Sequence, residues 1–522
     1  MSISTSGSKT SPANGTCNKG IPKGGDEPAE VSQKFTTVFI ANRGEIAVRI
    51  ARTLKSMGIR SVAPYTEPDS NAYHIEVVDQ AVKVPSYLDA DALLQTALEH
   101  GAQALHPGYG FLSENAGFAQ RCAEAGIVFI GPSPEAITAM GDKLTAKETM
   151  KKAGLPLVPG WSGSGDEVES GAQSVGFPLL VKAAAGGGGK GMRLVRQPGE
   201  LKEAVARAQG EALKAFGDDR VFLERFIESP RHIEVQIFGD THGNAYCFGE
   251  RECSLQRRYQ KIVEEAPSAV VSPELRARLV QAGVDAVKAL KYVGAGTVEF
   301  ILDASDNFYF LEVNTRLQVE HPVTEMVYGV DLVALGVRAA QGEALDIPEW
   351  FLQPRGWSLE ARVYAEDPDN GFLPSVGTLE VFRAPEGPGL RLDTGFREGD
   401  EVSIHFDPML AKLISYGATR EEARGRLLSA LREFAVLGVT TNIPYLVRIL
   451  QHSSFIESQF HTQFLEQNPT LFAKPSDEGK ERLAAALAGA FSKSRPLSNG
   501  VAATAERPET AWSTLTSWRN NA

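Results

Sequence analysis

The stretch from Phe308 to Pro322 constrains the fold of this 522-residue chain more than any other. Its first half alternates apolar and polar side chains: Tyr309, Leu311 and Val313 are apolar, and Glu312 and Asn314 fall between them. Successive side chains of a β-strand point to opposite faces. The pattern therefore predicts a strand whose apolar side chains face a core and whose polar side chains face a cleft.

If the extended backbone continues, Arg316, Gln318 and Glu320 join the same polar face. Carboxylate and amide oxygens suit Mg²⁺ or Mn²⁺, whose remaining ligands are phosphate oxygens and waters. The guanidinium of Arg316 suits a planar oxyanion, because its fork binds two oxygens at once. The alternative is the solvated face of an edge strand, but a run of such mixed chemistry is not typical of a plain charged surface.

A second strand, Gly294 to Ile301, carries Glu299 inside an apolar run. Only the short turn around Asp303 to Asn307 separates it from the first stretch, so the two strands are expected to pair in antiparallel fashion. That pairing brings Glu299 close to Glu312. Neighbouring carboxylates repel each other, and a divalent cation between them removes that penalty.

Strands and helices alternate in the first part of the chain. Strands are predicted at 36–41, 61–65, 104–105 and 128–130, and helices at 45–57 and 91–100. This order predicts a parallel sheet covered by helices, with ligands beyond the carboxyl ends of its strands. The loop that starts with residues 106–110 and ends in Ser113-Glu114-Asn115 lies there. The turn Asn42 to Glu45 is no Gly-x-Gly-x-x-Gly, so the sequence does not support a dinucleotide site.

A glycine run follows the strand predicted from Phe177 to Lys182. Gly186 to Gly189 precede Lys190, and a second strand is predicted from Met192 to Val195. Glycine amides can approach phosphate oxygens closely, and a lysine at either end favours a mobile lid over a nucleotide rather than a plain flexible hairpin. The pattern is not a Walker motif, because no Gly-Lys-Ser/Thr leads into a helix.

Further elements complete the expected order. Helices are predicted at 140–153, which carries Lys143, and at 273–290 and 421–434, and strands at 221–227, 232–236 and 359–365. Arg257, Arg258 and Lys261 fall between residues 254 and 265, which alone would suit a solvated basic turn. Arg362 lies inside its strand, and a buried arginine is rare without an anionic partner.

Composition narrows the classes of function. The net charge of −12 argues against a general nucleic-acid binder, and no stretch is apolar enough for a membrane span. The four cysteines form no Cys-x-x-Cys, which fits a reduced compartment and offers no zinc site. Residues 1–34 and 474–522 are expected to be disordered at least in part, and neither a secretory signal nor a typical transit peptide is evident.

Several segments together resemble the biotin carboxylase family, within the ATP-grasp enzymes. They are Ile40–Ala47, His106–Asn115, Lys182 with the glycine run, Arg231–Gln236, Ser254–Arg258, Gly296–Phe300 and Phe310–Pro322. The resemblance implies α/β and α+β architecture: a parallel α/β domain at 35–156, an ATP-grasp lid at 157–228, and an ATP-grasp core with a mixed carboxy-terminal domain at 229–473.

The resemblance also implies a reaction. ATP and bicarbonate form carboxyphosphate, which carboxylates N1 of biotin and leaves ADP and phosphate. The part from Gly395 to Tyr445 is most similar to acyl-CoA carboxylase subunits of the acetyl-CoA or methylcrotonyl-CoA type, with urea carboxylase also near. Implied partners are a biotin carboxyl carrier protein or biotinylated subunit, a carboxyltransferase subunit and a second copy of the chain. The expected location is cytoplasmic, with the mitochondrion as the alternative.

Site residues follow by motif. ATP would be bound by Lys143, Lys182, Gly188, Gly189, Glu224, Arg225, Phe226, Ile227, His232, Gln256, Tyr259, Glu299 and Glu312. Mg²⁺ or Mn²⁺ would be held by Glu299, Glu312 and Asn314. Bicarbonate would be bound by Lys261, Arg316, Gln318 and Val319. Glu320 would deprotonate bicarbonate, with its ionised form favoured by neighbouring Arg316, and Arg362 would stabilise charge on the biotin ureido oxygen.

Two departures from the family pattern are informative. The family has His, sometimes Asn, at the position of Tyr259, so altered ATP affinity is expected. The chain has no Ala-Met-Lys-Met turn, so it should act on biotin carried by another protein. A non-catalytic nucleotide-binding scaffold and a carbamoyl-phosphate-forming ligase are the competing hypotheses. The intact acids speak against the first, and Arg362 with residues 310–322 speaks against the second.

Overall fold

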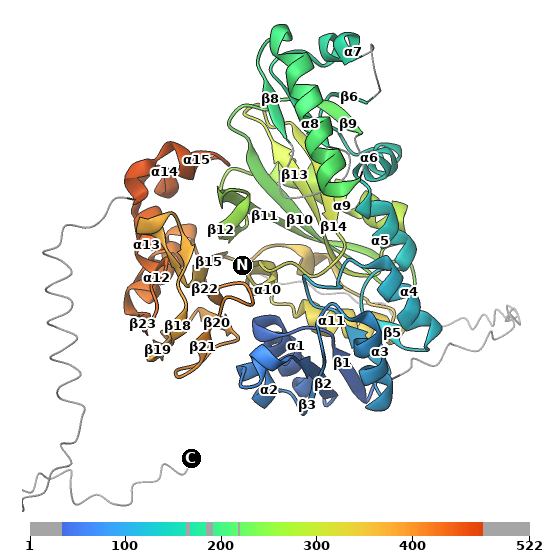
Figure 1. Cartoon of the computed structure of the whole chain (residues 1–522), viewed down its shortest axis with the longest axis vertical. Helices are drawn as coiled ribbons and strands as arrows, with labels where there is room; N and C mark the ends of the chain where they lie inside the picture. Colours follow the sequence, from blue (N-terminus) through green and yellow to red (C-terminus); the bar gives the residue numbers. More distant parts are fainter. Residues whose placement is uncertain (1–33, 163–167, 184–191, 218–219, 473–522) are drawn as a thin grey trace, which may run out of the picture. The chain divides into compact units, whose positions relative to one another are not determined.

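The computed structural model describes residues 34–162, 168–183, 192–217 and 220–472 (Figure 1). The described residues up to Leu471 form one compact unit. The segments expected to be disordered lie outside the described residues, except for Lys34. None of the described helices is long and apolar enough to cross a membrane.

A parallel sheet occupies the amino-terminal part, as the alternation of strands and helices predicts. Its order is β3-β2-β1-β4-β5. The strands are β1 (Thr37–Ile40), β2 (Arg60–Tyr65), β3 (Gln80–Lys83), β4 (Ala104–His106) and β5 (Val128–Phe129). Helices α1 (Gly44–Ser56), α2 (Tyr73–Val77), α3 (Ala90–Glu99) and α4 (Ala116–Glu124) connect them. His106 ends its strand at the carboxyl edge of the sheet, where the ligand loop was expected.

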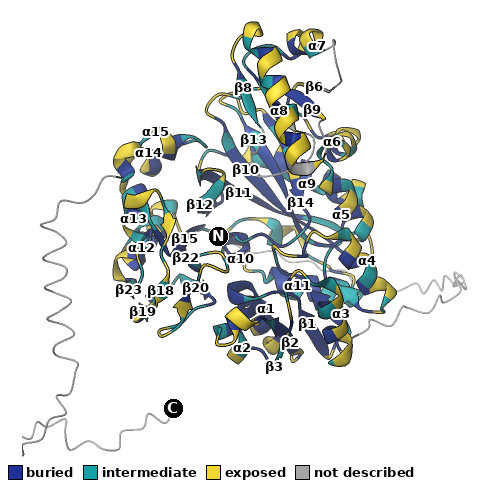
Figure 2. Ribbon diagram, viewed as in Figure 1, coloured by how far each residue is buried: buried dark blue, intermediate teal, exposed yellow. Residues whose placement is uncertain are grey.

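An antiparallel sheet of eight strands forms the centre of the molecule. Its order is β14-β13-β10-β11-β12-β15-β22-β20. The strands are β14 (Phe308–Asn314), β13 (Gly294–Leu302), β10 (Arg231–Gly239), β11 (Ala245–Arg257), β12 (Gln260–Ala266), β15 (Trp357–Tyr364), β22 (Met409–Gly417) and β20 (Leu390–Thr394). Figure 2 shows β10 and β11 buried along most of their length.

A third sheet has the order β6-β9-β7-β8 and is antiparallel. Its strands are β6 (Gly160–Ser162), β9 (Val221–Arg225), β7 (Leu179–Ala183) and β8 (Arg193–Val195), and its helices are α7 (Val168–Val175) and α8 (Leu201–Phe216). An apolar cluster of its own, including Val181 and Leu223, holds this sheet and its helices together. The glycine run predicted to cover a nucleotide lies outside the described residues.

The remaining elements cover these sheets. The helices are α5 (Pro134–Gly141), α6 (Lys143–Lys152), α9 (Pro273–Leu290), α10 (His321–Tyr328), α11 (Leu332–Ala340), α12 (Arg420–Glu433), α13 (Ile443–Gln451), α14 (Ser453–Ile456) and α15 (Phe464–Gln467). Short strand pairs are β16 (Glu366–Asp367) with β17 (Leu373–Pro374), β18 (Gly377–Thr378) with β21 (Glu401–Val402), and β19 (Val381–Arg383) with β23 (Ala435–Leu437).

Local capping explains one match and one mismatch with the predicted helices. α9 spans the predicted residues, because Ser272 accepts a hydrogen bond from the backbone N–H of Leu275 and Pro273 opens the helix. The helix predicted at 140–153 is confirmed as α6, but its predicted start is wrong, because α6 begins at Lys143 and Met140 belongs to α5. Asp142 has an extended backbone and caps α6 by accepting from the N–H of Thr145, so α5 and α6 are separate helices.

The central strand also departs from strict alternation. Glu299 pairs with Glu312 as predicted, but Phe300 pairs with Phe310, so a bulge at Leu311 shifts the faces. Phe310 and Val313 are buried in the core that packs on α9, whereas Tyr309 and Leu311 are only half-buried. The core position predicted for Val313 is therefore confirmed, and the one predicted for Tyr309 is wrong. The extended backbone ends at Asn314, and α10 begins at His321.

Candidate functional site

The ammonium group of Lys261 lies at the centre of the predicted site. Its Nζ donates to Glu234 Oε2 at 2.5 Å, Glu299 Oε1 at 2.9 Å and Glu320 Oε1 at 2.6 Å. Burial alone would lower the pKa of Lys261, but these three carboxylates outweigh it and hold the pKa well above its usual value. Lys261 is therefore a fixed cation on the polar face of the eight-stranded sheet.

Glu320 joins Lys261 to Arg362. The Nη2 of Arg362 donates to Glu320 Oε2 at 2.9 Å, and its Nε donates to Glu264 Oε1 at 2.6 Å. Burial would raise the pKa of Glu320, but Lys261, Arg362 and Arg251 hold it well below its usual value. The ionised form is favoured as predicted, although Lys261 and Arg362, rather than Arg316, make the direct contacts.

Arg251 is fully buried and contacts Glu234, one of the three acids that hold Lys261. Its Nε donates to Glu234 Oε1 at 2.6 Å, and its Nη1 reaches Gln236 Oε1 at 2.6 Å and Thr324 Oγ1 at 2.9 Å. These bonds tie β10 and β11 to α10, the helix that follows Glu320. Arg251 thereby fixes the acids that hold Lys261.

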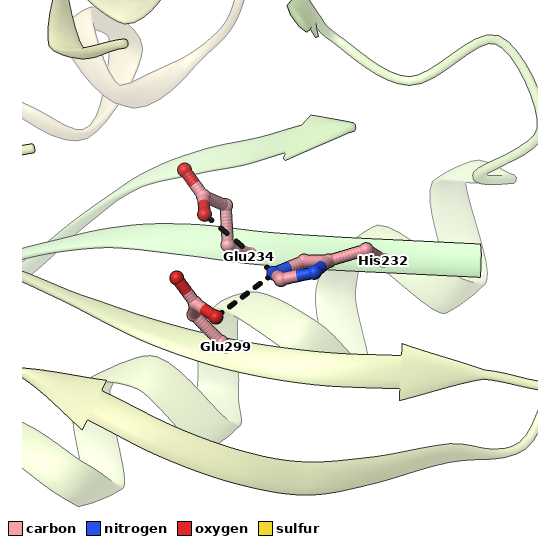
Figure 3. A group of neighbouring side chains, drawn as sticks. All are labelled: His232, Glu234 and Glu299. Carbon is pink, nitrogen blue, oxygen red and sulfur yellow. Dashed lines mark ion pairs between the residues drawn. The ribbon is translucent and has the colours of Figure 1, made fainter. Parts of the chain in front are cut away.

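His232 stands beside the same acids, as Figure 3 shows. Its Nε2 lies 3.0 Å from Glu299 Oε2 and 3.9 Å from Glu234 Oε2, and its Nδ1 lies 2.7 Å from Gln256 Nε2. His232 and Glu234 share β10, and Glu299 comes from the adjacent β13. Two predicted nucleotide-binding residues, His232 and Gln256, are thus in direct contact.

The three predicted metal ligands also lie together. Asn314 Nδ2 donates to Glu299 Oε1 at 2.9 Å, and Glu312 is the register partner of Glu299 and is exposed. Desolvation by the surrounding protein and the charge of Glu299 raise the pKa of Glu312. This unrelieved repulsion between paired carboxylates fits a divalent cation, which favours oxygen ligands.

Three of the four predicted bicarbonate residues, Arg316, Gln318 and Val319, follow β14 on a loop rather than a strand, and the fourth, Lys261, lies on β12. Arg316 donates to Glu114 Oε2 at 3.0 Å, Asn314 Oδ1 at 3.1 Å and Gln318 Oε1 at 3.3 Å. Gln318 Nε2 reaches Glu299 at 3.2 Å, and the carbonyl of Val319 accepts from Lys412 Nζ at 2.9 Å. The loop places these side chains beside the acids although the predicted strand does not continue.

A separate group surrounds Glu224. Lys182 Nζ lies 2.5 Å from Glu224 Oε2, and Lys147 donates to its other oxygen. Lys147 also lies over the ring of Phe222, 3.9 Å from its centroid. Lys143 opens α6 nearby, where the charges of Glu312, Lys182 and Glu224 act on its pKa, which burial lowers. Three lysines around one carboxylate leave positive charge available for phosphate groups.

Other predicted residues are not part of these contacts. Arg225 is exposed and donates to the carbonyl of Val175, and Phe226 and Ile227 follow β9 half-buried. Tyr259 is 61% exposed, in a hairpin turn where it and Arg258 both have positive φ. Gly188 and Gly189 lie outside the described residues.

Sequence patterns did not single out several residues that hold the site together. They are Glu114, Lys147, Glu234, Arg251, Glu264 and Lys412. The alternation from His232 to Gln236 contained the signal for Glu234, because its polar members share one face. Glu114 falls in the loop expected at the sheet edge. Lys412 gave no signal, because Glu45 and Val319, which it contacts, are distant from it in the sequence.

Three family models match the chain in succession. They describe a biotin carboxylase N-terminal domain at residues 34–137, a carbamoyl-phosphate synthase L chain ATP-binding domain at 142–348, and a biotin carboxylase C-terminal domain at 360–467. The models cover all the elements that carry the contacts described above.

Known relatives agree with these models. A methylcrotonoyl-CoA carboxylase alpha subunit of rat mitochondria is 47% identical over 476 residues, covering 89% of this chain and 67% of the relative. A biotin carboxylase of a Nostoc species is 48% identical over 443 residues, covering 83% of this chain and 99% of the relative. The chain thus spans about two thirds of the first relative and nearly all of the second.

A solved structure has the same fold. The biotin carboxylase domain dimer of Hydrogenobacter thermophilus 2-oxoglutarate carboxylase, in complex with MgADP, ADP and bicarbonate, superposes with a TM-score of 0.81 at 45% sequence identity. The match covers 85% of this chain and 100% of that domain.

Proposed function

We propose, because the chain belongs to the biotin carboxylase family, that it uses ATP and bicarbonate to carboxylate biotin carried by another protein. ADP and phosphate are the other products. The single observation that carries this proposal is the contact of Glu320 with both Lys261 and Arg362, beside the metal-type acids Glu299 and Glu312.

The charges explain how the reactants can meet. ATP and bicarbonate are both anions, and cations must offset their repulsion. In our proposal Lys143, Lys182 and His232 bind phosphate or ribose oxygens, with Glu224–Ile227, Gln256 and Tyr259 around the nucleotide. Mg²⁺ or Mn²⁺, held by Glu299, Glu312 and Asn314, would neutralise charge on the phosphates. The three lysines around Glu224 support the assignment of this group to the phosphates of the nucleotide.

Bicarbonate binding and deprotonation fall to the loop after β14. Arg316 presents a guanidinium next to Gln318 and the backbone of Val319, a set suited to a planar anion. Glu320 takes the proton of bicarbonate, since its carboxylate is ionised at rest. Lys261 keeps the resulting dianion close to the nucleotide.

Arg362 is the residue that favours biotin over other acceptors. Two carboxylates occupy its Nε and Nη2. Its remaining nitrogen, Nη1, is the one we assign to the ureido oxygen of biotin. A carbamoyl-phosphate-forming ligase has no need of this group, and the biotin carboxylase C-terminal model includes it.

Partners and location follow from the relatives as proposals. A biotinylated carrier and a carboxyltransferase subunit would complete an acyl-CoA carboxylase, and the chain would form a homodimer like the related domain. We propose the domain limits 35–156, 157–228 and 229–473. The compartment is the cytoplasm or, as in the named rat relative, the mitochondrion.

ADP release tests the proposed reaction. Purified full-length protein with ATP and Mg²⁺ should release ADP faster when free biotin and bicarbonate are both added. ADP release that does not change when both are omitted would reject the proposal and favour a nucleotide-binding scaffold. Capture of a biotinylated protein from the source cell would identify the carrier.

A further inference from the structure

Two buried acids lie directly opposite each other behind Arg362. Glu264 of β12 and Glu360 of β15 are register partners, and they are 1% and 0% exposed. Opposed side chains in such a pair have Cβ atoms about 5 Å apart. Glu264 Oε1 accepts from Arg362 Nε at 2.6 Å, but Glu264 Oε2 and both oxygens of Glu360 have no hydrogen-bond partner among the described residues.

The surrounding charges do not neutralise two carboxylates. Glu264 is faced by Arg362, Lys261 and Glu320, and Glu360 by Lys412, Arg362, Glu320 and Tyr109. Lys261 already contacts three other acids, which leaves Arg362 as the contacting cation of Glu264.

The ammonium of Lys412 is also engaged. It lies 2.9 Å from the carbonyl of Val319, 3.0 Å from Glu45 Oε1 and 3.7 Å from Asp393 Oδ2. Within the part of the chain that the structure describes, Glu360 therefore has no cation in direct contact. A buried carboxylate without a contacting cation costs several kcal/mol, and such a group takes up a proton instead.

The direction of titration agrees with this geometry. Burial and the nearby charge of Glu320 outweigh Arg362 and raise the pKa of Glu264 to about 7. Burial raises the pKa of Glu360 well above its usual range, and Lys412 opposes this only in part. Since the two acids interact, the pair titrates as a unit.

We propose that Glu264 and Glu360 share one proton, carried by Glu360, so that Glu264 presents a single negative charge that positions Arg362 for biotin. Glu264 is then a positioning residue, because it acts through the guanidinium and does not touch the substrate. This inference rests on the proposed function for Arg362. The position of the proton on Glu360 does not depend on that function, because it is argued from the contacts and burial of the two acids.

The arrangement has a use during turnover. When Glu320 accepts the proton of bicarbonate, the O–H bond of bicarbonate breaks and a new O–H bond forms on Glu320. Both electrons of the broken bond stay on the oxygen, which leaves the carbonate dianion and a neutral Glu320. Glu320 then loses its attraction for Arg362 Nη2. Glu264 keeps its charge through this step and holds Nε in place, so the guanidinium does not follow the dianion before biotin arrives.

Infrared spectroscopy of the full-length protein tests the shared proton without reference to activity. At slightly alkaline pH the wild type should have the carbonyl band of a buried protonated carboxyl. Glu360→Gln should lose that band, and Glu265→Gln should keep it. Glu265 is a matched control: it lies next to Glu264 on the same strand, is also buried, and pairs with Arg420 instead. A spectrum that Glu360→Gln leaves unchanged would overturn the shared proton.

Steady-state kinetics test the positioning role. Glu264→Gln should raise the KM for free biotin about tenfold or more, because Arg362 loses its anchor, with the KM for ATP unchanged. Glu360→Gln should change either value less than about twofold, since it replaces a neutral acid by a neutral amide of the same shape. Glu264→Asp should recover part of the biotin KM.

The outcomes separate the possible failures. If Glu265→Gln raises the KM for biotin as much as Glu264→Gln does, Glu264 has only a structural role, and the positioning role is overturned. If Glu360→Gln raises the KM for biotin as much as Glu264→Gln does, the proposal that Glu360 is neutral in the wild type is overturned. If Glu264→Gln does not fold, Glu360→Gln and the infrared band still decide. Wild-type protein without biotin-dependent ADP release would instead refute the proposed function.

Discussion

Two buried charge networks lie on the eight-stranded sheet and its neighbours, and their charge balance differs. In the site network, five acids (Glu234, Glu264, Glu299, Glu320 and Glu360) surround three cations (Arg251, Lys261 and Arg362). In the second network, between α1, α10, β20 and β22, four acids (Glu45, Glu325, Asp331 and Asp393) meet three cations (Arg49, Arg391 and Lys412).

Hydrogen bonding differs in the same way. Both oxygens of Glu325 are bonded, to Arg49 at 2.7 Å and to Arg391 at 2.7 Å, and both oxygens of Asp393 accept from Arg391. Three oxygens of Glu264 and Glu360 have no partner among the described residues. A network that is closer to charge balance fixes helices and strands, whereas the larger excess of acids in the site network leaves negative charge to be offset by a metal ion or a proton.

The largest effect is expected when the proposed general base of the site network is replaced. Glu320→Gln should lower kcat for biotin carboxylation by about 10²–10⁴-fold, because the amide cannot accept the proton of bicarbonate. Glu325→Gln, in the second network, is the matched control and should keep turnover in the folded protein. Retained turnover in Glu320→Gln would contradict its assignment as the base.

Breaking the second network should cost stability instead. Arg49→Met removes one of the two cations that contact Glu325 and the arginine that contacts Asp331, and the free energy of unfolding should fall by about 1–3 kcal/mol in denaturant titrations. Arg52→Met on the exposed face of the same helix should change it by less than about 0.5 kcal/mol. An activity loss without a stability loss in Arg49→Met would place this network in the site.

The two networks should respond to pH with opposite sign. The pKa of Asp393 is lowered by Arg391 and Lys412 against burial, so its stabilising contribution is present above the unfolded pKa of 3.8 and is lost in stronger acid. The pKa of Glu264 is raised from 4.5 to about 7, so below pH 7 the folded protein takes up a second proton, on Glu264, in addition to the one that Glu360 holds, and the unfolded chain releases it. Stability from that proton is present at low pH and is lost as pH rises from 4.5 to 7.

Unfolding free energies measured across this range check both signs. Glu264→Gln should remove a fall on the order of 3 kcal/mol between pH 4.5 and 7. Asp393→Asn should leave that fall in place and reduce the loss in stronger acid. Identical pH profiles for the two variants would remove the distinction between the networks.

A smaller effect is expected where the site network meets the metal. Glu312→Gln should raise the Mg²⁺ concentration needed for half-maximal ADP release about tenfold, since one charged ligand is lost. The metal-free variant should be no less stable than the wild type, because Glu312 is exposed and repelled by Glu299. A loss of stability in that variant would mean that Glu312 has a structural role.

The smallest effect is expected outside both networks. Tyr259 is exposed on its hairpin turn, and its phenol can donate a hydrogen bond. Tyr259→His should change the KM for ATP by less than about tenfold and leave kcat unchanged. A large fall in kcat would give Tyr259 a direct part in the chemistry.

Local signals in the sequence predicted much of the fold. The helix at 273–290 has both its cap and its proline within a few residues, and the pairing of Glu299 with Glu312 depends only on a short turn. The bulge at Leu311 could not be predicted, because the aromatic residues Phe308 and Phe310 compete with Tyr309 and Leu311 for the core side.

The rest of the site depends on strands that are distant in the sequence. β12 pairs with β15, and β15 pairs with β22. No local sequence pattern predicts this order of strands. Glu264 meets Arg362, and Lys412 meets Val319, only because of this order. The chemistry of Glu320 and Arg362 was predicted from residue types, but the acids that hold them required the structure.

The most direct test of the central claim is the transfer of isotopically labelled carbon from bicarbonate to free biotin by the full-length protein, with ATP and Mg²⁺. We predict that the label appears on biotin with the wild type and is lost with Glu320→Gln. A folded wild-type protein that transfers no label, or a variant that transfers as much as the wild type, would contradict the account.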